Sequence, residues 1–182
     1  MRRIISDSVS VAFIISSRVP QDIYKGFNSS NAFSVSIASQ VVQHDTTHDE
    51  VRAISLLVEE TFMDFFVERG FVITNLPAEI SENSSQDKKA LKSGLLSADE
   101  GMCKYFIQLV IDYKNNSNSP EAFLLSNIKD IQWKIYDVKT EQVLKSGKNI
   151  VGSIMQNENS ENGIKSFTDE ISNSVYKYLM EK

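Results

Sequence analysis

The sequence is poor in the residues that most often carry out chemistry. It contains one cysteine, Cys103, and two histidines in 182 residues. A single cysteine excludes an internal disulfide but leaves the redox compartment undetermined. Cys103 lies in an alternating apolar stretch, which predicts a buried structural residue rather than a nucleophile. The seven glycines do not cluster into a phosphate-binding loop, and the Gly-x-Ser-x-Gly elbow of serine hydrolases is missing.

Basic residues and long apolar runs are also scarce. The chain has 19 Lys and Arg residues against 24 Asp and Glu residues, for a formal net charge of −5. A nucleic-acid surface needs a basic stripe that replaces counterions, so this balance argues against a nucleic-acid partner. No run approaches the roughly 18 apolar residues that a membrane helix needs.

The amino terminus has some features of a secretory signal. The stretch "MRR" is basic and "VSVAFIIS" is apolar, but Ser6, Asp7 and Ser8 interrupt the sequence around them. No small-residue cleavage site follows, and no lipid-accepting cysteine is present. We therefore expect no retained signal peptide, and a membrane link only through a lipid anchor that this sequence does not contain.

The remaining composition is that of an ordinary globular protein. Hydrophobic residues make up 41% and charged residues 24%, and the length suits one domain over residues 1–182. Alternation of apolar and polar residues predicts strands that bury one face. The segments that alternate, or that are short and apolar between turn residues, are 9–15, 33–37, 71–75, 103–113, 131–135 and 144–150.

Two longer segments have helical spacing. Residues 48–69 carry apolar side chains three or four apart, and Gly70 follows where glycine commonly ends a helix. Residues 164–179 repeat this spacing near the carboxyl end. Residues 77–100 are polar, and we expect a flexible loop with a short helix there.

Strands separated by helices predict an α+β fold. Because most strands have one apolar face, we expect a mixed, mostly antiparallel sheet of about six strands. Two or three helices should pack on one face of this sheet.

The predicted helix 48–69 has a second, narrower apolar stripe formed by Leu56, Met63 and Val67. A helix with two apolar stripes usually contacts more than the sheet beneath it. The stripe could pack against another helix of the same domain, or it could contact a partner or a second copy of this chain.

Both histidines lie in "VVQHDTTHDEVRA", where His44 and His48 are four residues apart beside Asp49 and Glu50. On a helix this spacing places two ligands on one face, which suits zinc. Thr47 and Glu50, however, form the pattern of a capping box, and His44 would then precede the helix. The catalytic His-Glu-x-x-His motif is absent. We predict no metal and no other cofactor, and keep a site at His44, His48 and Asp49 as the alternative.

Apolar residues also occur on the polar side of two predicted strands. Phe106, Val110 and Tyr136 fall there, among Gln108 and Lys134. Exposed aromatic residues ringed by polar groups are typical of protein interfaces. Together with the helical stripe, these residues are our candidates for partner binding. The alternative is that a helix covers this face as well.

The segment "IQWKIYDVKTEQVLKSGKNIVG", residues 131–152, resembles a hairpin of bacterial envelope accessory proteins. These are the TolB amino-terminal domain, the curli secretion lipoprotein CsgG and the penicillin-binding-protein activator LpoB, whose hairpin runs roughly "L-x-D-x-K-T-G-E-x-V-W-S-G". Glu141 replaces the turn glycine, and Leu144 and Lys145 replace the aromatic residue. The resemblance spans residues 48–152, and the matching hairpin residues are Tyr136, Asp137, Val138, Lys139, Thr140, Ser146 and Gly147.

The resemblance implies a non-enzymatic domain of the periplasm or outer envelope, commonly tethered by a lipidated cysteine, that binds other envelope proteins. It transfers no catalytic residue, because the matched positions are turn and strand residues. Two other hypotheses stay open. One is a small-ligand or metal-binding protein or enzyme that uses His44 and His48 with nearby carboxylates. The other is a self-assembling subunit that uses the stripe of Leu56, Met63 and Val67.

Overall fold

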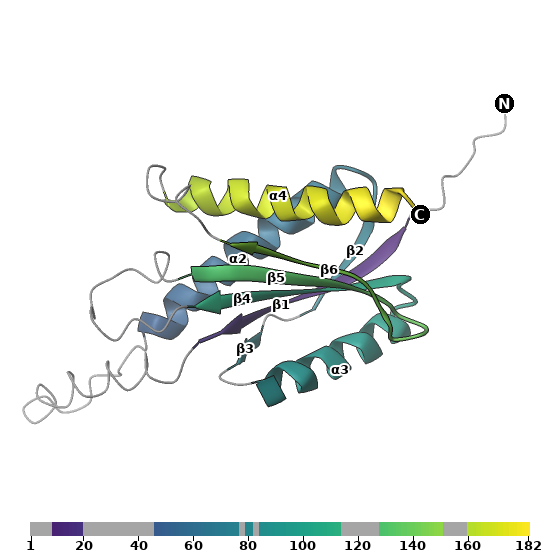
Figure 1. Cartoon of the computed structure of the whole chain (residues 1–182), viewed down its shortest axis with the longest axis horizontal. Helices are drawn as coiled ribbons and strands as arrows, with labels where there is room; N and C mark the ends of the chain where they lie inside the picture. Colours follow the sequence, from purple (N-terminus) through teal and green to yellow (C-terminus); the bar gives the residue numbers. More distant parts are fainter. Residues whose placement is uncertain (1–8, 20–45, 77–78, 82–83, 114–127, 151–159) are drawn as a thin grey trace, which may run out of the picture.

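The computed structural model describes residues 9–19, 46–76, 79–81, 84–113, 128–150 and 160–182. Within these ranges, six strands form one sheet and three helices cover it (Figure 1). The elements, in chain order, are β1 (Ser10–Arg18), α2 (Thr46–Val67), β2 (Val72–Asn75), β3 (Glu79–Ser81), α3 (Ser84–Glu100), β4 (Tyr105–Tyr113), β5 (Ile128–Asp137), β6 (Val143–Ile150) and α4 (Ser160–Met180).

The sheet has the order β2-β1-β4-β5-β6, with β3 paired to the far half of β1. Strand β1 is parallel to β2, β3 and β4, whereas β4, β5 and β6 are antiparallel. The predicted α+β class and mixed sheet are confirmed. Antiparallel pairing is confined to one half, because crossovers through α2 and α3 return the chain in the parallel sense. The strand predicted at 33–37 lies outside the described residues.

Helices α2 and α4 cover the first face of the sheet (Figure 1). Phe62 and Phe66 of α2 form the centre of an aromatic cluster, with ring centroids 4.8 Å apart, and Phe13 of β1 lies 5.2 Å from Phe62. Tyr176 of α4 joins the cluster from the side. The helix ends as predicted, since Gly70 has a left-handed φ of 80° just after it.

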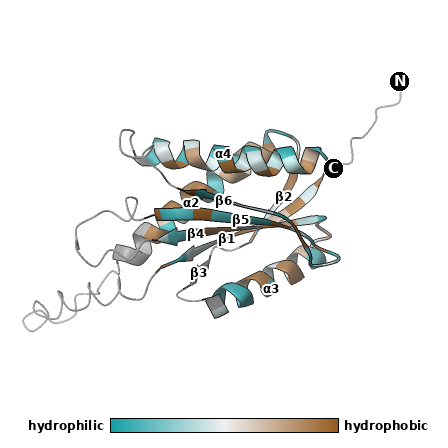
Figure 2. Ribbon diagram, viewed as in Figure 1, coloured by the Kyte–Doolittle hydropathy of each residue, from teal (hydrophilic) through white to brown (hydrophobic). Residues whose placement is uncertain are grey.

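Two helices thus pack on the first face, within the predicted two or three, and helix α3 covers the opposite face. The apolar side of α3 packs on Ala12 and Ile14 of β1 and on Phe106 and Tyr136 of β4 and β5. This second layer forms because β1 and β4 carry apolar residues on both sides, which is typical of parallel strands covered twice. Figure 2 shows this apolar character along both strands. The α3 residues involved are Leu91, Leu95 and Ala98.

The contact between α3 and the sheet is closest at Gly94. A Cβ atom added at this glycine would lie 2.6 Å from Cζ of Phe106. Phe106 is fully buried, so a movement of its ring would disturb the residues packed around it. For residues 77–100, the sequence predicts a flexible loop and a short helix. The structure has β3 and a 17-residue helix in this segment, and the helix packs closely on the sheet.

A tight turn joins β5 to β6. The Asp137 carboxylate accepts hydrogen bonds from Thr140 N at 2.8 Å and Thr140 Oγ1 at 3.1 Å. Glu141 then has a φ of 56°, a left-handed conformation that normally favours glycine. On β6, Gly147 lies directly against the indole of Trp133, and a Cβ atom there would overlap the ring. Two positions of the hairpin are therefore restricted: Glu141 by its left-handed backbone and Gly147 by the lack of space beside Trp133.

We predict that Gly94→Ala destabilises the protein. Alanine at an exposed helix position normally gains about 1 kcal/mol over glycine. Here the added methyl group would press on Phe106, and overpacking of this kind costs about 1–3 kcal/mol. Urea unfolding should show a lower midpoint for Gly94→Ala. The neighbouring exposed variant Ser93→Ala should leave the midpoint unchanged or raise it slightly, and an equal gain in both variants would disprove the close contact.

We predict that Glu141→Gly stabilises the protein by about 1 kcal/mol, because glycine pays no steric penalty in the left-handed region. Gln142→Gly is the matched control, because Gln142 is also exposed but has an ordinary backbone conformation. It should lose about 0.5–1 kcal/mol. Thermal or urea unfolding distinguishes the two variants, and a loss of stability in Glu141→Gly would contradict the turn geometry.

Candidate functional site

A row of charged side chains crosses the sheet on the α3 side, at the end where β1 and β4 finish. Arg18 of β1 donates from Nε to Asp87 Oδ2 of α3 at 2.9 Å, and its Nη2 reaches the same oxygen. Its Nη1 lies 3.8 Å from Asp112 Oδ2 of β4. Farther along, Lys148 Nζ of β6 lies 3.1 Å from Asp130 Oδ2 of β5. This charge row connects α3 with four strands of the sheet.

Two carboxylates stand side by side at the centre of the charge row. Asp112 and Asp130 are direct partners across β4 and β5, an arrangement in which like charges repel. Asp130 is 1% exposed and accepts a hydrogen bond from Gln132 Nε2 at 3.2 Å in addition to its ion pair. Burial raises the pKa of Asp112 above its usual value; Arg18 opposes this rise and Asp130 adds to it. The flanking cations offset the electrostatic repulsion between the two carboxylates.

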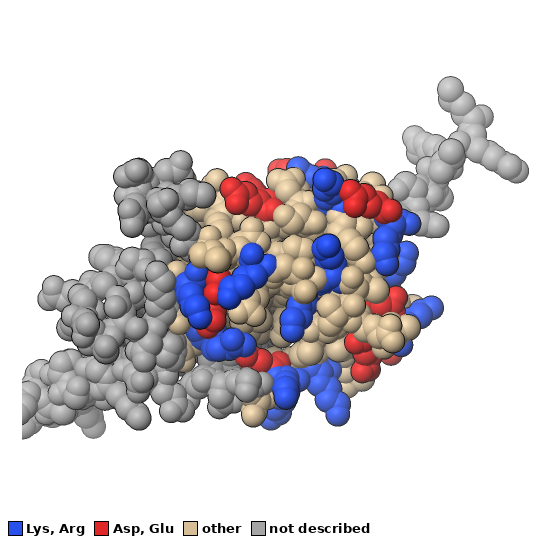
Figure 3. Space-filling view, viewed as in Figure 1, with Lys and Arg blue, Asp and Glu red and all other residues tan. Residues whose placement is uncertain are grey.

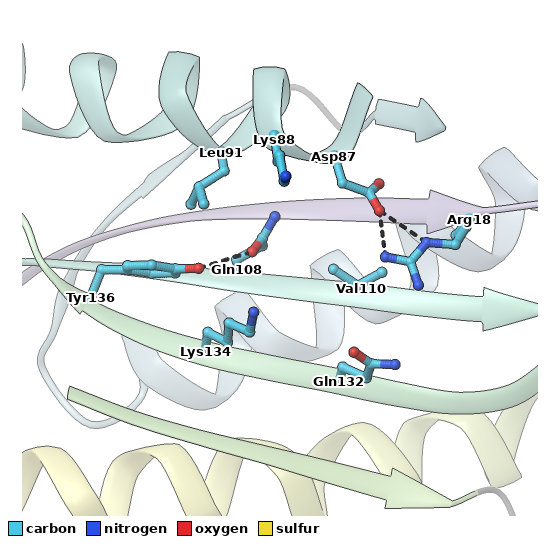
Figure 4. Close-up of a pocket in the computed structure, with 9 residues that line it drawn as sticks. All are labelled: Arg18, Asp87, Lys88, Leu91, Gln108, Val110, Gln132, Lys134 and Tyr136. Carbon is cyan, nitrogen blue, oxygen red and sulfur yellow. Dashed lines mark hydrogen bonds and ion pairs between the residues drawn. The ribbon is translucent and has the colours of Figure 1, made fainter. Parts of the chain in front are cut away.

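Next to the charge row, a cavity of about 190 Å³ lies between α3 and the sheet (Figure 4). We call it the α3 cavity. Its walls come from the start of α3, the end of β1 and the middle of β4 and β5, so the fold brings together segments far apart in the sequence. The lining residues are Arg18, Asp87, Lys88, Leu91, Gln108, Val110, Gln132, Lys134 and Tyr136.

The buried wall of the α3 cavity is polar. Tyr136 OH donates a hydrogen bond to Gln108 Oε1 at 3.4 Å, and both residues are about 95% buried. Burial also raises the pKa of the Tyr136 hydroxyl. The Gln108 oxygen is thus engaged, whereas its amino group is directed into the cavity (Figure 4) and makes no hydrogen bond with any described residue. The cavity floor therefore presents a hydrogen-bond donor.

Two lysines stand at the opening of the α3 cavity. Lys88 points down from α3 and Lys134 points up from β5, so that their ammonium groups approach the cavity from opposite sides (Figure 4). Both side chains are exposed, and neither forms an ion pair or hydrogen bond within the described part of the chain. Lysine and arginine side chains are also prominent over the β5–β6 part of the surface in Figure 3.

The sheet residues expected to form an exposed patch lie beneath α3 instead. Phe106 is 0% exposed, Tyr136 4% and Val110 8%. The expectation of an exposed aromatic patch is wrong, because α3 covers this face, and the alternative of a covering helix holds. Tyr136 and Val110 line the α3 cavity, whereas Phe106 lies against Gly94 of α3.

The second stripe of α2 is partly accessible. Leu56 is 53% and Val67 54% exposed, and both are large apolar residues. Met63, between them on the same side of the helix, is partly buried against the main core. We call these three residues the α2 stripe. It lies on the helix that covers the first face, away from the α3 cavity.

A groove of about 440 Å³ adjoins the α2 stripe at Leu56. It runs between the first half of α2 and the start of α4, where Ile54 and Ile164 form its apolar floor. Glu60 and Glu161 stand at its rim. The groove and the α2 stripe together form an apolar surface bordered by acidic side chains.

The residues of the alternative metal site lie outside the side chains that the structure describes. His44 lies outside the described residues, and His48 and Asp49 are placed only as backbone within the first turn of α2, which begins at Thr46. No group of three His, Cys, Asp or Glu side chains suited to a metal ion occurs among the described residues. Cys103 is a buried free thiol, as its alternating context predicts. Of the helices described, none has an apolar stretch sufficient to cross a membrane.

Only part of the α3 cavity is predictable from the sequence. Alternation along β4 and β5 placed Gln108, Lys134 and Tyr136 on one face, as observed. Arg18 and Asp87 could not be predicted, because their ion pair joins residues 69 positions apart. Opposite charges at the end of β1 and in the first turn of a helix are the only local signal for this pair.

Several solved structures resemble the chain at low identity. The PelC dodecamer from Paraburkholderia phytofirmans has a TM-score of 0.37 and 13% identity, with 87% of this chain and 81% of that chain covered. A variant dodecamer of the same protein has a TM-score of 0.43 and 11% identity, with 91% and 86% covered. Lipoprotein GNA1162 from Neisseria meningitidis has a TM-score of 0.31 and 9% identity, with 96% and 99% covered.

No curated protein matches the sequence. A family model described as "Uncharacterised protein" matches residues 36–180, well over half of the chain. The chain therefore belongs to this family of uncharacterised proteins.

Proposed function

We propose that this chain is a non-catalytic domain of the bacterial cell envelope that acts by binding another envelope protein. The main support is the geometry of the β5–β6 turn. In the envelope accessory proteins whose hairpin this sequence resembles, the turn position has glycine, and here Glu141 adopts the left-handed conformation that glycine favours. The local backbone thus fits the resembled motif at the position where the sequence departs from it.

Three other matched residues, Asp137, Thr140 and Gly147, also have structural roles in the hairpin. Asp137 and Thr140 bond to each other across the turn, with Thr140 N donating to Asp137 Oδ1 at 2.8 Å. Gly147, of the matched Ser-Gly pair, leaves room for the indole of Trp133. These three matched residues therefore shape the hairpin, which supports the resemblance as one of fold and of a structural role.

The surface that best suits a protein partner is the α2 stripe with the adjoining groove. Exposed apolar residues beside a concave apolar surface, rimmed by charged groups, are typical of protein interfaces. Glu60 at the rim favours a partner with a basic side chain at its edge, whereas Glu161 is already paired with Lys165 of α4 at 2.9 Å. A second copy of this chain is the other occupant that the same test examines.

We predict that replacing both Leu56 and Val67 by Glu weakens partner binding at least about tenfold, because charges would enter an apolar contact. Both side chains are half exposed, so the unfolding midpoint should change little. The measurement is capture of envelope proteins on the immobilised chain, with sedimentation velocity to detect self-association. Leu96→Glu, at a 61% exposed residue of α3, is the matched control.

Three results would contradict the proposal. Equal losses in the Leu96→Glu control would show a general effect of added charge. Unchanged capture and unchanged sedimentation in the double variant would remove the α2 stripe as the binding surface. Recovery of the native protein from the cytosol on cell fractionation would remove the envelope location.

A further inference from the structure

We propose that the α3 cavity binds a phosphate group, held between Lys88 and Lys134. The two ammonium groups approach the cavity from opposite sides, one from α3 and one from β5 (Figure 4). Between them, the Gln108 amino group is directed into the cavity from a side chain that is 5% exposed. None of these three donors has a partner among the described residues. Three donors that face one cavity and are free to bind suit a ligand that supplies several acceptors.

The charge balance of the cavity favours an anion. Its lining contains three cations, Arg18, Lys88 and Lys134, and one carboxylate, Asp87, which is already paired with Arg18. The two lysines therefore leave the lining with an excess of positive charge, although the whole chain has a net charge of −5. A cationic ligand would be repelled, and a neutral one would leave the ammonium groups without an anion.

The kind of donor favours phosphate over carboxylate. A carboxylate is best matched by the planar fork of a free arginine. The fork of Arg18 already holds Asp87 through Nε and Nη2. The donors that remain are two ammonium groups, which act as point charges, and an amide. These suit a tetrahedral group with a charge of about −1.5 to −2, whose oxygens point in several directions.

The size of the α3 cavity limits how much of a ligand it holds. Its volume is about 190 Å³, and about 10–15 Å³ of such volume is enough to hold one water molecule. The cavity thus has room for a phosphate group and for part of an organic remainder. Anything larger would extend through the opening beside the exposed lysines. Free phosphate and a small phosphate ester share this chemistry, and their affinities for the chain would distinguish them.

The test is isothermal titration calorimetry of the full chain with inorganic phosphate at constant ionic strength. We expect saturable binding of one phosphate per chain. Removing one charged donor in Lys88→Gln or Lys134→Gln should weaken binding about tenfold. A parallel titration with glycerol phosphate distinguishes the two sources, because a phosphate ester as the natural ligand should bind more tightly than inorganic phosphate.

Two control variants match the test variants. Lys89→Gln alters the next lysine of α3, and Lys145→Gln alters an exposed lysine of β6, and neither residue lines the cavity. Both controls should bind phosphate like the unaltered chain. Equal weakening in test and control variants would show a diffuse attraction to lysines and overturn the proposal, as would the absence of saturable binding by the unaltered chain.

Nuclear magnetic resonance gives a second readout that does not depend on the lysine variants. Phosphate bound in the cavity should shift the side-chain amide signals of Gln108 and Gln132, which line it. The side-chain amide of Asn149, which accepts a hydrogen bond from Trp133 on the other face of the sheet, should not shift. Binding without a Gln108 shift would place the phosphate elsewhere and overturn the proposal. Because the α2 stripe lies outside the cavity, this result is independent of the partner-binding experiment.

Discussion

Helix α3 is fastened to the second face of the sheet at two places, and the α3 cavity lies between them. At Gly94 the helix approaches Phe106 so closely that no side chain fits between them. At Asp87, about two turns earlier, the helix is bound to Arg18 at the end of β1. Gln108 and Val110 follow Phe106 along β4 and form the floor between these contacts. The close contact and the ion pair together fix the shape of the cavity.

The two faces of the sheet are held by different forces. On the first face, large aromatic and aliphatic residues of α2 and α4 form the main core, whose stability comes mostly from apolar burial. On the second face the apolar cluster is smaller and extends over one end of the strands. The other end is held by the charge row, in which Arg18 and Lys148 flank the paired carboxylates of Asp112 and Asp130. The position of α3 therefore depends on electrostatic balance more than that of α2 or α4.

The sequence predicts the first layer of this protein better than the second. Regular alternation in β4 and β5 identifies the residues of each face, and helical spacing with Gly70 identifies α2. The side on which α3 packs could not be predicted, because its few apolar residues are embedded in a polar segment. Alternation predicts an exposed face for Phe106 and Tyr136, but they are buried by α3, a helix with small residues such as Gly94 and Ala98.

The hairpin was predicted from the sequence and the α3 cavity was not, because the hairpin is formed by neighbouring residues and the cavity by distant ones. A hairpin is a local structure, so its turn can be predicted from the nearby residues Asp137 and Thr140. The cavity combines residues of β1, α3, β4 and β5, and its chemistry depends on which charges are already paired. Lys88 and Lys89 are adjacent lysines that the sequence does not distinguish, yet only Lys88 lines the cavity opposite Lys134. A bound anion there would join α3 to β5 across the cavity, so ligand binding and the packing of α3 on the sheet would stabilise each other.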